Sequence, residues 1–402
     1  MTSLSTKPLR ILQIGMGWFP EQPGGLDRVY YEVCNRLQNL PEVALHGLVA
    51  GSPLVAEQSR GAIRAFASAN TALPQRLWAA RKAIRETLRT FQPNLIAAHF
   101  ALYTFPALDA LRGKPLVFHF HGPWAMEGSA EKERDMATRL KKSLEKRVYQ
   151  KAQHFIVLSK AFQEVLAQEY SIPRDRIHIV PGGIEVERYA DLPRDKQAAR
   201  RQLGWPLERP VALVVRRLRR RMGLELLLHS LARLKESFPE FLVLIAGKGP
   251  LSPVLETLIQ QLGLQNQVRL IGFLPDEQLP IAYCAADFTI VPTVALEGFG
   301  LITIESLAAG TPALVTPIGG LPEVIRPFRP EWVTEAATEE ALTERLRAVL
   351  SGQIPYPPAL ECQEYVRQNF DWSIILPKIV QVYTLAMNEH RSAAQPTTGK
   401  PT

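Results

Sequence analysis

Short apolar runs alternate with amphipathic stretches along most of the chain. In the first half, apolar runs that predict strands lie at residues 9–14, 43–49, 95–99, 115–121, 154–158 and 177–180. Stretches with helical periodicity lie between them, at residues 27–40, 73–91, 131–152 and 160–170. Such alternation of strands and helices predicts a parallel sheet with helices on both faces.

The second half repeats this plan. Its predicted strands lie at residues 211–215, 241–246, 268–271, 288–291 and 313–316, and its predicted helices at 224–236, 251–262, 279–285 and 304–309. Residues 181–210 are rich in proline, glycine and charge, which favours a linker. We therefore expect an α/β protein with two doubly wound, Rossmann-like domains, 1–188 and 189–370, then a helix at 371–390 and a disordered polar tail at 391–402.

The composition is that of a soluble globular protein, with 46% hydrophobic and 21% charged residues in a chain of 402. No apolar stretch approaches the roughly 20 residues of a spanning helix, and the polar N-terminus lacks the core of a signal peptide. We therefore expect a cytoplasmic protein. The three cysteines are odd in number and far apart, which favours free buried thiols over a metal site or disulfides.

The net charge of +8 lies entirely in residues 1–190, because residues 191–402 carry equal numbers of basic and acidic side chains. A basic domain favours an anionic partner. We therefore expect the first half to meet an anionic acceptor or a phospholipid surface, such as the inner face of the plasma membrane. The alternative is an ordinary solvated helix at 131–152, where acidic residues interrupt the basic ones.

Ligands of doubly wound sheets bind at the carboxyl ends of the strands, so residues at those ends are the candidates for chemistry. Gly15 and Gly17 follow the first strand, but the other residues of a dinucleotide fingerprint are missing, which disfavours a nicotinamide or flavin enzyme. Gly24 and Gly25 precede a helix, where bare backbone N–H groups can approach an anion; a plain tight turn is the alternative.

Two histidines lie near the end of the predicted strand 115–121. His121 is followed by a Gly-Pro break, and its ring there can bond a sugar hydroxyl or a phosphate. His119 lies on the same face of the strand, one step deeper. For each of them, a structural histidine with satisfied hydrogen bonds is the alternative.

Arginines crowd the segment between the strand 211–215 and the helix that begins near Gly223, at positions 216, 217, 219, 220 and 221. Cations at a helix N-terminus cost a few tenths to about 1 kcal/mol each, which favours a bound polyanion. Guanidinium groups match the oxygens of a diphosphate, and we expect Arg217 and Arg221 to bind one. Nucleic acid is disfavoured, because this half is neutral and the cluster contains no aromatic residues.

The strongest signal follows the strand 288–291. Glu297 precedes a turn with glycines at 298 and 300, and Glu305 lies about one turn into the next helix. The turn exposes N–H groups at a helix start, which predicts an anion site. Carboxylates on both sides suit hydroxyl groups of a sugar and a ribose better than phosphate. Otherwise Glu297 is a loop charge and Glu305 the partner of a surface arginine.

The segment from Glu297 to Glu305 resembles the paired-glutamate motif of retaining glycosyltransferases of family 4. Their architecture, GT-B, places two Rossmann-like domains face to face across a cleft, and a C-terminal helix crosses back to the N-terminal domain. The resemblance extends over most of the chain: residues 23–25 look like the glycine loop of the family, 121–122 like its active-site histidine, and 180–185, 245–250 and 271–275 like segments around its linker and nucleotide pocket.

The resemblance implies a role for each matching residue. Glu305 would hold the ribose and Glu297 the donor sugar, while His121 would bind the sugar near the reacting carbon and Arg217 the diphosphate. The remaining donor-site residues would be Gly24, Gly25, Arg221, the backbone of Gly298, Phe299, Gly300, Leu301, Ile302 and Thr303, and, for the base, the backbone near Phe273 and Leu274. The first domain would bind the acceptor and the second the nucleotide sugar.

Some positions depart from the family pattern. The family usually carries Gly-Arg-Leu followed by a Lys-Gly pair, but here the glycine is Arg216 and the lysine is Met222. Arg217 is kept, and we expect Arg221 to replace the lysine. The usual asparagine of a Pro-Asn-Gly segment is Gly182.

The resemblance implies a retaining glycosyltransferase that moves a sugar from a UDP- or GDP-linked donor to a hydroxyl acceptor. From the basic first half we further expect a lipid-linked acceptor and a role in cell-envelope glycolipid or polysaccharide synthesis. Since no Asp-x-Asp motif is present, we expect no required metal. The alternatives are another enzyme of this architecture, such as an epimerase or a phosphorylase, and a non-catalytic binding protein.

Overall fold

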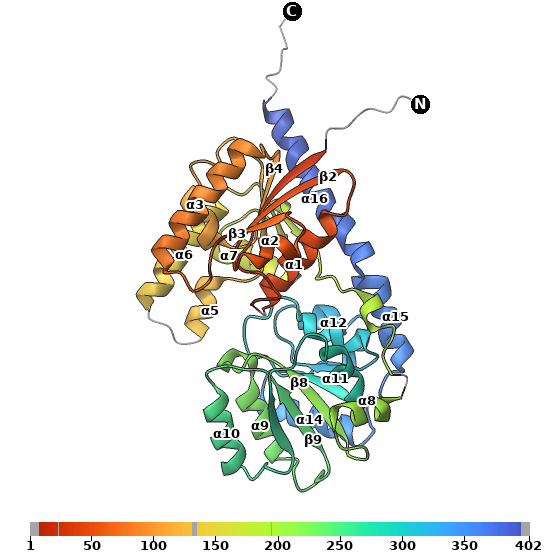
Figure 1. Ribbon diagram of the computed structural model, residues 1–402. Helices are drawn as coiled ribbons and strands as arrows, with labels where there is room; N and C mark the ends of the chain where they lie inside the picture. Colours follow the sequence, from red (N-terminus) through yellow and green to blue (C-terminus); the bar gives the residue numbers. More distant parts are fainter. Residues whose placement is uncertain (1–7, 23, 131–134, 194, 395–402) are drawn as a thin grey trace, which may run out of the picture. The chain divides into compact units, whose positions relative to one another are not determined.

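The computed structural model describes residues 8–22, 24–130, 135–193 and 195–394, which form two compact units (Figure 1). The first unit holds most residues up to Pro181 together with the C-terminal part from Ile375. The second unit runs from Gly182 to Ile374 and includes a short piece that begins at Glu127. Each unit contains one parallel β-sheet, which confirms the predicted fold class of two doubly wound domains.

The first unit contains a seven-stranded parallel sheet in the order β3-β2-β1-β4-β5-β6-β7. Its strands are β1 (Leu9–Ile14), β2 (Val43–Ala50), β3 (Ile63–Ala67), β4 (Leu95–Ala98), β5 (Leu116–Phe120), β6 (His154–Val157) and β7 (Ile177–Ile179). All except β3 were predicted within a residue or two. The edge strand β3 pairs only with β2 and buries little besides Ile63, so its sequence lacks a clear apolar run.

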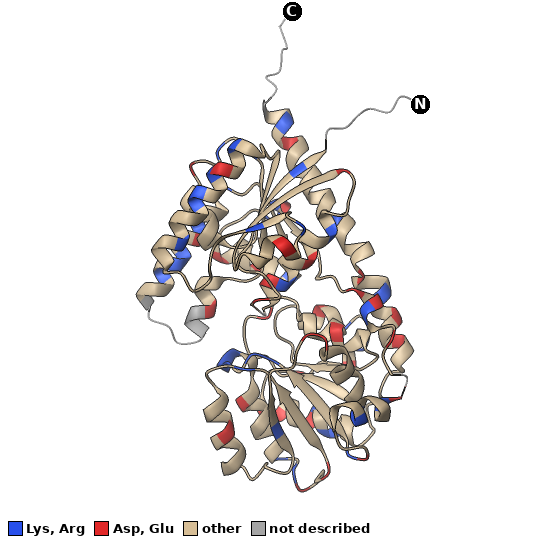
Figure 2. Ribbon diagram, in the orientation of Figure 1, with Lys and Arg blue, Asp and Glu red and all other residues tan. Residues whose placement is uncertain are grey.

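Helices cover both faces of this sheet. They are α1 (Gly25–Leu37), α2 (Leu54–Gln58), α3 (Leu73–Thr90), α4 (Ala101–Thr104), α5 (Trp124–Ala130), α6 (Asp135–Tyr149), α7 (Lys160–Glu169) and the long α16 (Trp372–Ala394). Lysines and arginines gather along the outer sides of α3 and α6 (Figure 2). α16 continues four residues beyond the predicted end of the helix at residue 390, and residues 395–402 of the predicted tail lie outside the described part of the chain.

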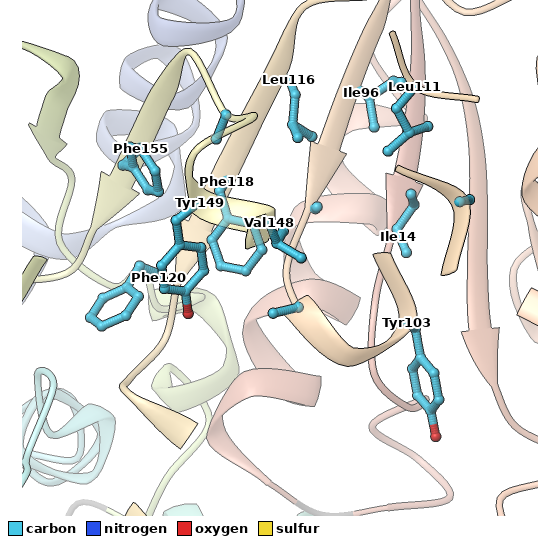
Figure 3. Packing of buried hydrophobic residues seen from close by; sticks show 14 of the residues in the cluster. Ile14, Ile96, Tyr103, Leu111, Leu116, Phe118, Phe120, Val148, Tyr149 and Phe155 are labelled. Carbon is cyan, nitrogen blue, oxygen red and sulfur yellow. The ribbon is translucent and has the colours of Figure 1, made fainter. Parts of the chain in front are cut away.

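The alternation of side chains along β5 divides the interior of the first unit. Phe118 and Phe120 point into a large apolar cluster with Tyr149 of α6 and Phe155 of β6 (Figure 3). Successive side chains on a strand point to opposite faces, so His119 and His121 lie on the other side. A large apolar core on one face thus leaves the second face of β5 to polar side chains.

The second unit contains a five-stranded parallel sheet in the order β10-β9-β8-β11-β12. Its strands are β8 (Val211–Val215), β9 (Leu242–Ala246), β10 (Val268–Gly272), β11 (Phe288–Val291) and β12 (Ala313–Val315). Its helices are α8 (Lys196–Leu203), α9 (Leu224–Ala232), α10 (Ser252–Gln261), α11 (Leu279–Ala285), α12 (Leu301–Ala308), α13 (Leu321–Ile325), α14 (Glu339–Leu350) and α15 (Ala359–Phe370). The predicted strands and helices are all present here, while α8, α13, α14 and α15 were not predicted.

The predicted linker 181–210 is partly structured. Asp195 caps the N-terminus of α8 by accepting from the N–H of Gln197 at 3.0 Å. Arg200 of α8 is buried and donates to the Ala285 carbonyl oxygen at 2.9 Å and to Asp287 at 2.8 Å. These bonds attach α8 to the second unit, so the later part of the segment belongs to that domain. Composition alone missed it, because the helix is short and highly charged.

Candidate functional site

The loops at the carboxyl ends of the second sheet come together in backbone contact. A Cβ atom at Gly223 would lie 1.7 Å from the Pro292 carbonyl oxygen, and one at Gly247 would lie 1.8 Å from that of Arg216. Glycine at these two positions therefore lets the loops after β8, β9 and β11 touch. The strand order reverses between β8 and β11, and this is the place where doubly wound sheets bind ligands.

The turn from Glu297 to Gly300 leads directly into α12. Gly300 is the N-cap residue with a φ of 82°, a conformation that suits glycine. The Thr303 N–H donates to the Gly300 carbonyl oxygen at 2.8 Å, and the Thr303 hydroxyl donates to the same oxygen at 2.6 Å. The Thr303 N–H is therefore already engaged within the first turn of the helix. The N–H groups of residues 299–302 are left as the candidate donors to an anion.

The turn rests against a second glycine loop. The Gly320 N–H donates to the Glu297 carbonyl oxygen at 3.0 Å, and a Cβ atom at Gly319 would lie 1.8 Å from that oxygen. Leu296, just before the turn, has a φ of 53°, which is unusual for a residue with a branched side chain. The second glycine loop thus packs directly on the backbone of Glu297, Gly298 and Phe299.

Glu305 is buried one turn into α12, as predicted. Its side chain is 5% exposed and accepts a hydrogen bond from the hydroxyl of Tyr283 in α11 at 2.8 Å. The bond orients the carboxylate from the side of α11. Tyr283 was missed by the sequence analysis, since a tyrosine in an apolar helix carries no sign of a functional partner.

Glu297 lies in an ion pair that the sequence analysis did not predict. The Arg216 guanidinium donates to the carboxylate of Glu297 and to the hydroxyl of Thr293. The two charged side chains are only 7% and 14% exposed. Burial alone would raise the pKa of Glu297, but the charge and hydrogen bond of Arg216 outweigh it and lower the pKa, so Glu297 is ionised. Arg216, which replaces the family glycine, is therefore part of this site.

The two arginines that were expected at the diphosphate differ in their surroundings. Arg217 is exposed, but desolvation of its guanidinium and then the charge of Arg221 lower its pKa, which a bound anion would reverse. Arg221 is buried and donates to the Leu296 carbonyl oxygen at 3.0 Å. Met222, in place of the family lysine, is buried. Arg221 thus braces the turn before Glu297, and Arg217 is the more accessible cation.

Phe273 and Leu274 follow β10 at the same edge of the sheet. Phe273 is 47% exposed, and the Lys248 ammonium lies 5.7 Å from the centre of its ring. Gly182, where the family has asparagine, lies against side chains of the turn: a Cβ atom there would lie 2.7 Å from Leu301 and 2.9 Å from Phe299. The glycine is thus matched to the large apolar side chains that it meets.

His121 of the first unit belongs to a buried hydrogen-bond network. Its Nε2 atom lies 2.9 Å from Nδ1 of His99, which follows β4, and His99 Nε2 lies 2.9 Å from the Gln13 side-chain oxygen in β1. His119 Nε2 lies 2.6 Å from the hydroxyl of Tyr383 in α16. His119 and His121 share a face of β5, as predicted. The sequence analysis missed Gln13, His99 and Tyr383, which lie on separate elements.

The glycine loop at the start of α1 is held by an aspartate. Gly24 is the N-cap residue in an extended conformation, and Gly25 has open space where a side chain would lie. Asp27 is buried in the first turn and accepts from the Gly17 N–H at 2.8 Å. The loop around Gly24 and Gly25 thus has the bare backbone that the sequence predicts; Pro23 lies outside the described residues.

Family models match most of the chain. The model described as Glycosyltransferase Family 4 matches residues 23–188, and that described as Glycosyl transferases group 1 matches residues 195–369.

Curated relatives carry related names. The chain is 29% identical to an uncharacterized glycosyltransferase of Methanocaldococcus jannaschii, over 58% of this chain and 60% of that protein. It is 30% identical to a D-inositol 3-phosphate glycosyltransferase of Corynebacterium urealyticum, over 60% of this chain and 58% of that protein. The chain thus spans less than two thirds of the length of either. A protein of the same name from Streptomyces scabiei is 26% identical over 97% of this chain and 92% of its own length.

Solved structures share the fold at low sequence identity. The sucrose-phosphate synthase of Thermosynechococcus elongatus superposes with a TM-score of 0.77 and 20% identity, over 94% of this chain and 99% of that one. HepE of Anabaena, solved in complex with UDP, gives a TM-score of 0.73 and 19% identity over the same shares. These similarities support the GT-B fold of the chain.

Proposed function

Since this chain belongs to glycosyltransferase family 4, we propose that it transfers a sugar from a nucleoside diphosphate donor to a hydroxyl acceptor, with retention at the anomeric carbon. The observation that carries the proposal is the turn from Glu297 to Gly300 with Glu305 in the helix that follows. It combines a helix N-terminus for the diphosphate with two carboxylates for hydroxyl groups.

Each group has one task in the proposed reaction. Glu305, oriented by Tyr283, accepts from the ribose hydroxyls, and Glu297, paired with Arg216, meets the donor sugar. Arg217 and the N–H groups of residues 299–302 stabilise the negative charge that develops on the departing diphosphate. Such preorganised positive groups are usually the largest contribution to catalysis. Following the family resemblance, we assign His121 to the donor sugar and expect no metal requirement.

A UDP-linked donor is the first to test, because HepE was solved with UDP. We expect Arg217→Ala to reduce release of nucleoside diphosphate by on the order of a hundredfold or more, since it removes a cation beside the leaving group. Arg219→Ala is the matched control, because Arg219 is also an exposed arginine of this loop. Similar turnover in the Arg217 and Arg219 variants, both folded like the wild type, would remove Arg217 from the site.

For the acceptor, we propose a lipid-linked hydroxyl at an anionic membrane surface, in cell-envelope glycolipid or polysaccharide synthesis. No described helix is both long and apolar enough to cross a bilayer. However, Trp78 on α3 and Met136 and Leu140 on α6 are 66%, 83% and 72% exposed. Lysines and arginines lie along both helices (Figure 2). Exposed apolar side chains within a basic surface are typical of interfacial binding.

Vesicle binding tests this surface. We expect the wild type to sediment with vesicles that contain phosphatidylglycerol at low salt, and Trp78→Ser combined with Leu140→Ser to weaken this binding severalfold. Val254→Ser is the control, because Val254 is 43% exposed on α10 of the second unit. Absence of binding, or equal loss in the control, would reject the membrane surface and leave the transfer reaction unaffected.

One observation favours a second candidate function. Arg216 already neutralises Glu297, the residue assigned to the donor sugar, so the site could bind a nucleotide without turning it over. A binding protein of this kind would hold the nucleotide without turnover, whereas an epimerase would convert the nucleotide sugar without an acceptor and a phosphorylase would move a sugar to phosphate. Measuring nucleotide-sugar turnover beside nucleotide binding distinguishes these functions.

A further inference from the structure

We propose that Gln13 and His99 are positioning residues that hold His121 as a neutral imidazole with its proton on Nε2. The contacts that carry this inference all lie within the first unit, on β1, β4, β5 and α16. The inference depends on the proposed function only for the effect that this protonation state has on the donor sugar.

The side-chain amide of Gln13 sets the direction of the hydrogen bonds. Its oxygen faces His99 Nε2 at 2.9 Å, and its nitrogen donates to the Tyr383 hydroxyl at 3.0 Å. An amide oxygen only accepts, so His99 carries its proton on Nε2 and is left with an acceptor at Nδ1. This Nδ1 atom lies 2.9 Å from His121 Nε2, so His121 donates from Nε2. Gln13 thus sets the position of the proton on His121 through His99, which lies between them in the network.

The geometry of the two rings agrees with this bond. The ring centres of His99 and His121 are 5.1 Å apart and their planes differ by only 19°. A 2.9 Å contact between nitrogens at this separation and angle places the rings edge to edge, with the hydrogen bond near both ring planes. That is the favourable direction for both the N–H and the lone pair.

Tyr383 completes the network at its other end. Its hydroxyl accepts from Gln13, and we assign the hydroxyl hydrogen to a hydrogen bond that Tyr383 donates to His119 Nε2, 2.6 Å away. Burial raises the pKa of Tyr383, so the phenol keeps its proton. His119 in turn stacks on His99, with ring centres 4.1 Å apart and planes 10° apart. The bonds from Gln13 to Tyr383 and from Tyr383 to His119 thus agree with the amide orientation that sets the proton on His99.

The surroundings keep the imidazoles uncharged. Burial lowers the pKa of His99 and His119 well below the usual value and that of His121 to about 3. The ring of Tyr30 in α1 meets the His99 ring edge to face, with 5.1 Å between the ring centres. Burial raises the pKa of the Cys34 thiol, which lies beside Tyr30, so Cys34 stays uncharged as well. Among the described residues, the histidines themselves supply the charges that act on these rings, and no carboxylate is present to stabilise an imidazolium.

The same geometry disfavours a metal ion in this cluster. The histidines offer nitrogen atoms within 4.8 Å of one another, a spacing that a metal could use. However, an imidazole lone pair lies in the plane of its ring, and the planes of the stacked His99 and His119 are nearly parallel. Their lone pairs therefore do not converge on one point, as tetrahedral coordination requires. The cluster is arranged for directed hydrogen bonds between rings.

A proton fixed on Nε2 leaves Nδ1 of His121 as an acceptor. His121 is only partly buried, and no described residue donates to its Nδ1 atom. In the proposed function, this nitrogen accepts a hydrogen bond from a hydroxyl group of the donor sugar. A neutral acceptor disfavours a phosphate or carboxylate at that point, so the network selects a hydroxyl.

Nitrogen NMR of protein with 15N-labelled histidine rings tests the inference without substrate. At pH 7 we expect His121 to show a protonated Nε2 and an unprotonated Nδ1. His99→Phe and Gln13→Leu each remove a group that fixes the direction of the hydrogen bonds to His121. In both variants we expect His121 to populate both neutral tautomers, with the proton on Nε2 or on Nδ1. His119→Phe keeps a ring stacked on His99 and leaves Gln13 and His99 in place, so it is the control with unchanged His121 signals.

Other spectra would overturn the inference. A wild-type His121 that carries its proton on Nδ1, or that is an imidazolium at pH 7, contradicts the assigned direction. Unchanged His121 signals in both His99→Phe and Gln13→Leu contradict the positioning role. In kinetics, His99→Phe should lower kcat by on the order of a hundredfold. If the wild type turns over no nucleotide sugar, the proposed function fails, while the ring signals still decide this inference.

Discussion

The two units place polar residues at the carboxyl ends of parallel strands, but with opposite electrostatics. In the first unit, His121, His99 and Gln13 form a network without net charge, in which burial suppresses protonation. In the second unit, Arg216 and Glu297 form an ion pair in which attraction overcomes the cost of burial.

The difference fits the ligands that we propose for the two sites. A neutral network controls where protons lie, and it suits the uncharged hydroxyl groups of a sugar. An ionised site with further arginines nearby suits a diphosphate, whose charge has to be balanced. One sheet topology therefore supports both kinds of chemistry, because the residues at the strand ends, and not the fold, determine the electrostatics.

Of all the changes proposed here, acid should produce the largest difference in stability between the two units. The histidines are neutral in the folded protein but take up protons in the unfolded chain below about pH 6.5. Stability therefore falls as the pH drops from about 6.5, by about 1.4 kcal/mol per pH unit for each histidine that stays neutral when folded. The Arg216–Glu297 pair loses stability only at lower pH, because the pKa of Glu297 in the folded state lies below its ordinary value of 4.5.

Urea unfolding between pH 7 and 5, with hydrogen exchange mass spectrometry to distinguish the units, measures this. The first unit should weaken in this range while the second stays nearly constant. The double variant His99→Phe with His119→Phe is the control and should reduce the slope for the first unit. Weakening of the second unit first would contradict the comparison.

Removing one partner of the buried ion pair should have the next largest effect. We expect Arg216→Met to destabilise the second unit by about 3 kcal/mol, because it leaves the Glu297 carboxylate buried without its cation. The double variant Arg216→Met with Glu297→Gln should recover much of this loss. Chemical denaturation measures both, and a single variant as stable as the wild type would show that the pair is unimportant.

Restoring the family asparagine should also destabilise the second unit. We expect Gly182→Asn to cost about 1 to 3 kcal/mol, because its Cβ atom would overlap with Leu301 and Phe299. Gly25→Ala is the control without loss, since no atom lies within 4 Å of a Cβ atom there. Thermal unfolding of both variants measures the cost, and a stabilised Gly182→Asn would contradict the packing at the turn.

Removing the hydroxyl that orients Glu305 should have the smallest effect. We expect Tyr283→Phe to cost about 1 kcal/mol in stability and to weaken nucleotide binding severalfold. Tyr365→Phe removes a 2.7 Å hydrogen bond to the Val324 carbonyl oxygen in the same unit, so it should change stability but not affinity. Equal nucleotide affinities for the two variants would show that Tyr283 has no role in nucleotide binding.

Sequence patterns predicted the sheets well, because parallel strands are buried on both faces and appear as apolar runs. They missed β3, where a single neighbouring strand leaves part of the surface exposed. They also missed α14, which Thr338 caps by accepting from the Ala341 N–H at 3.3 Å. Local periodicity identifies elements that are strongly buried and misses those that are partly exposed.

Local spacing, without the family resemblance, indicated a candidate site only where its residues are neighbours in sequence. Glu297 and Glu305 share one segment, so their spacing predicted a common site. Arg216, by contrast, reaches Glu297 across 81 positions, and Gln13 reaches Tyr383 across 370. Such contacts depend on which strands become neighbours, and no local pattern records that.

The most direct test of the central claim is equilibrium binding of UDP and GDP to the wild type and to Glu305→Ala. We predict that the wild type binds at least one of them and that Glu305→Ala weakens this binding by about tenfold to a hundredfold, the value of a hydrogen bond to a charged group. Equal affinity in the two proteins, or no binding of either nucleotide to the wild type, would contradict a nucleotide-sugar site at this turn.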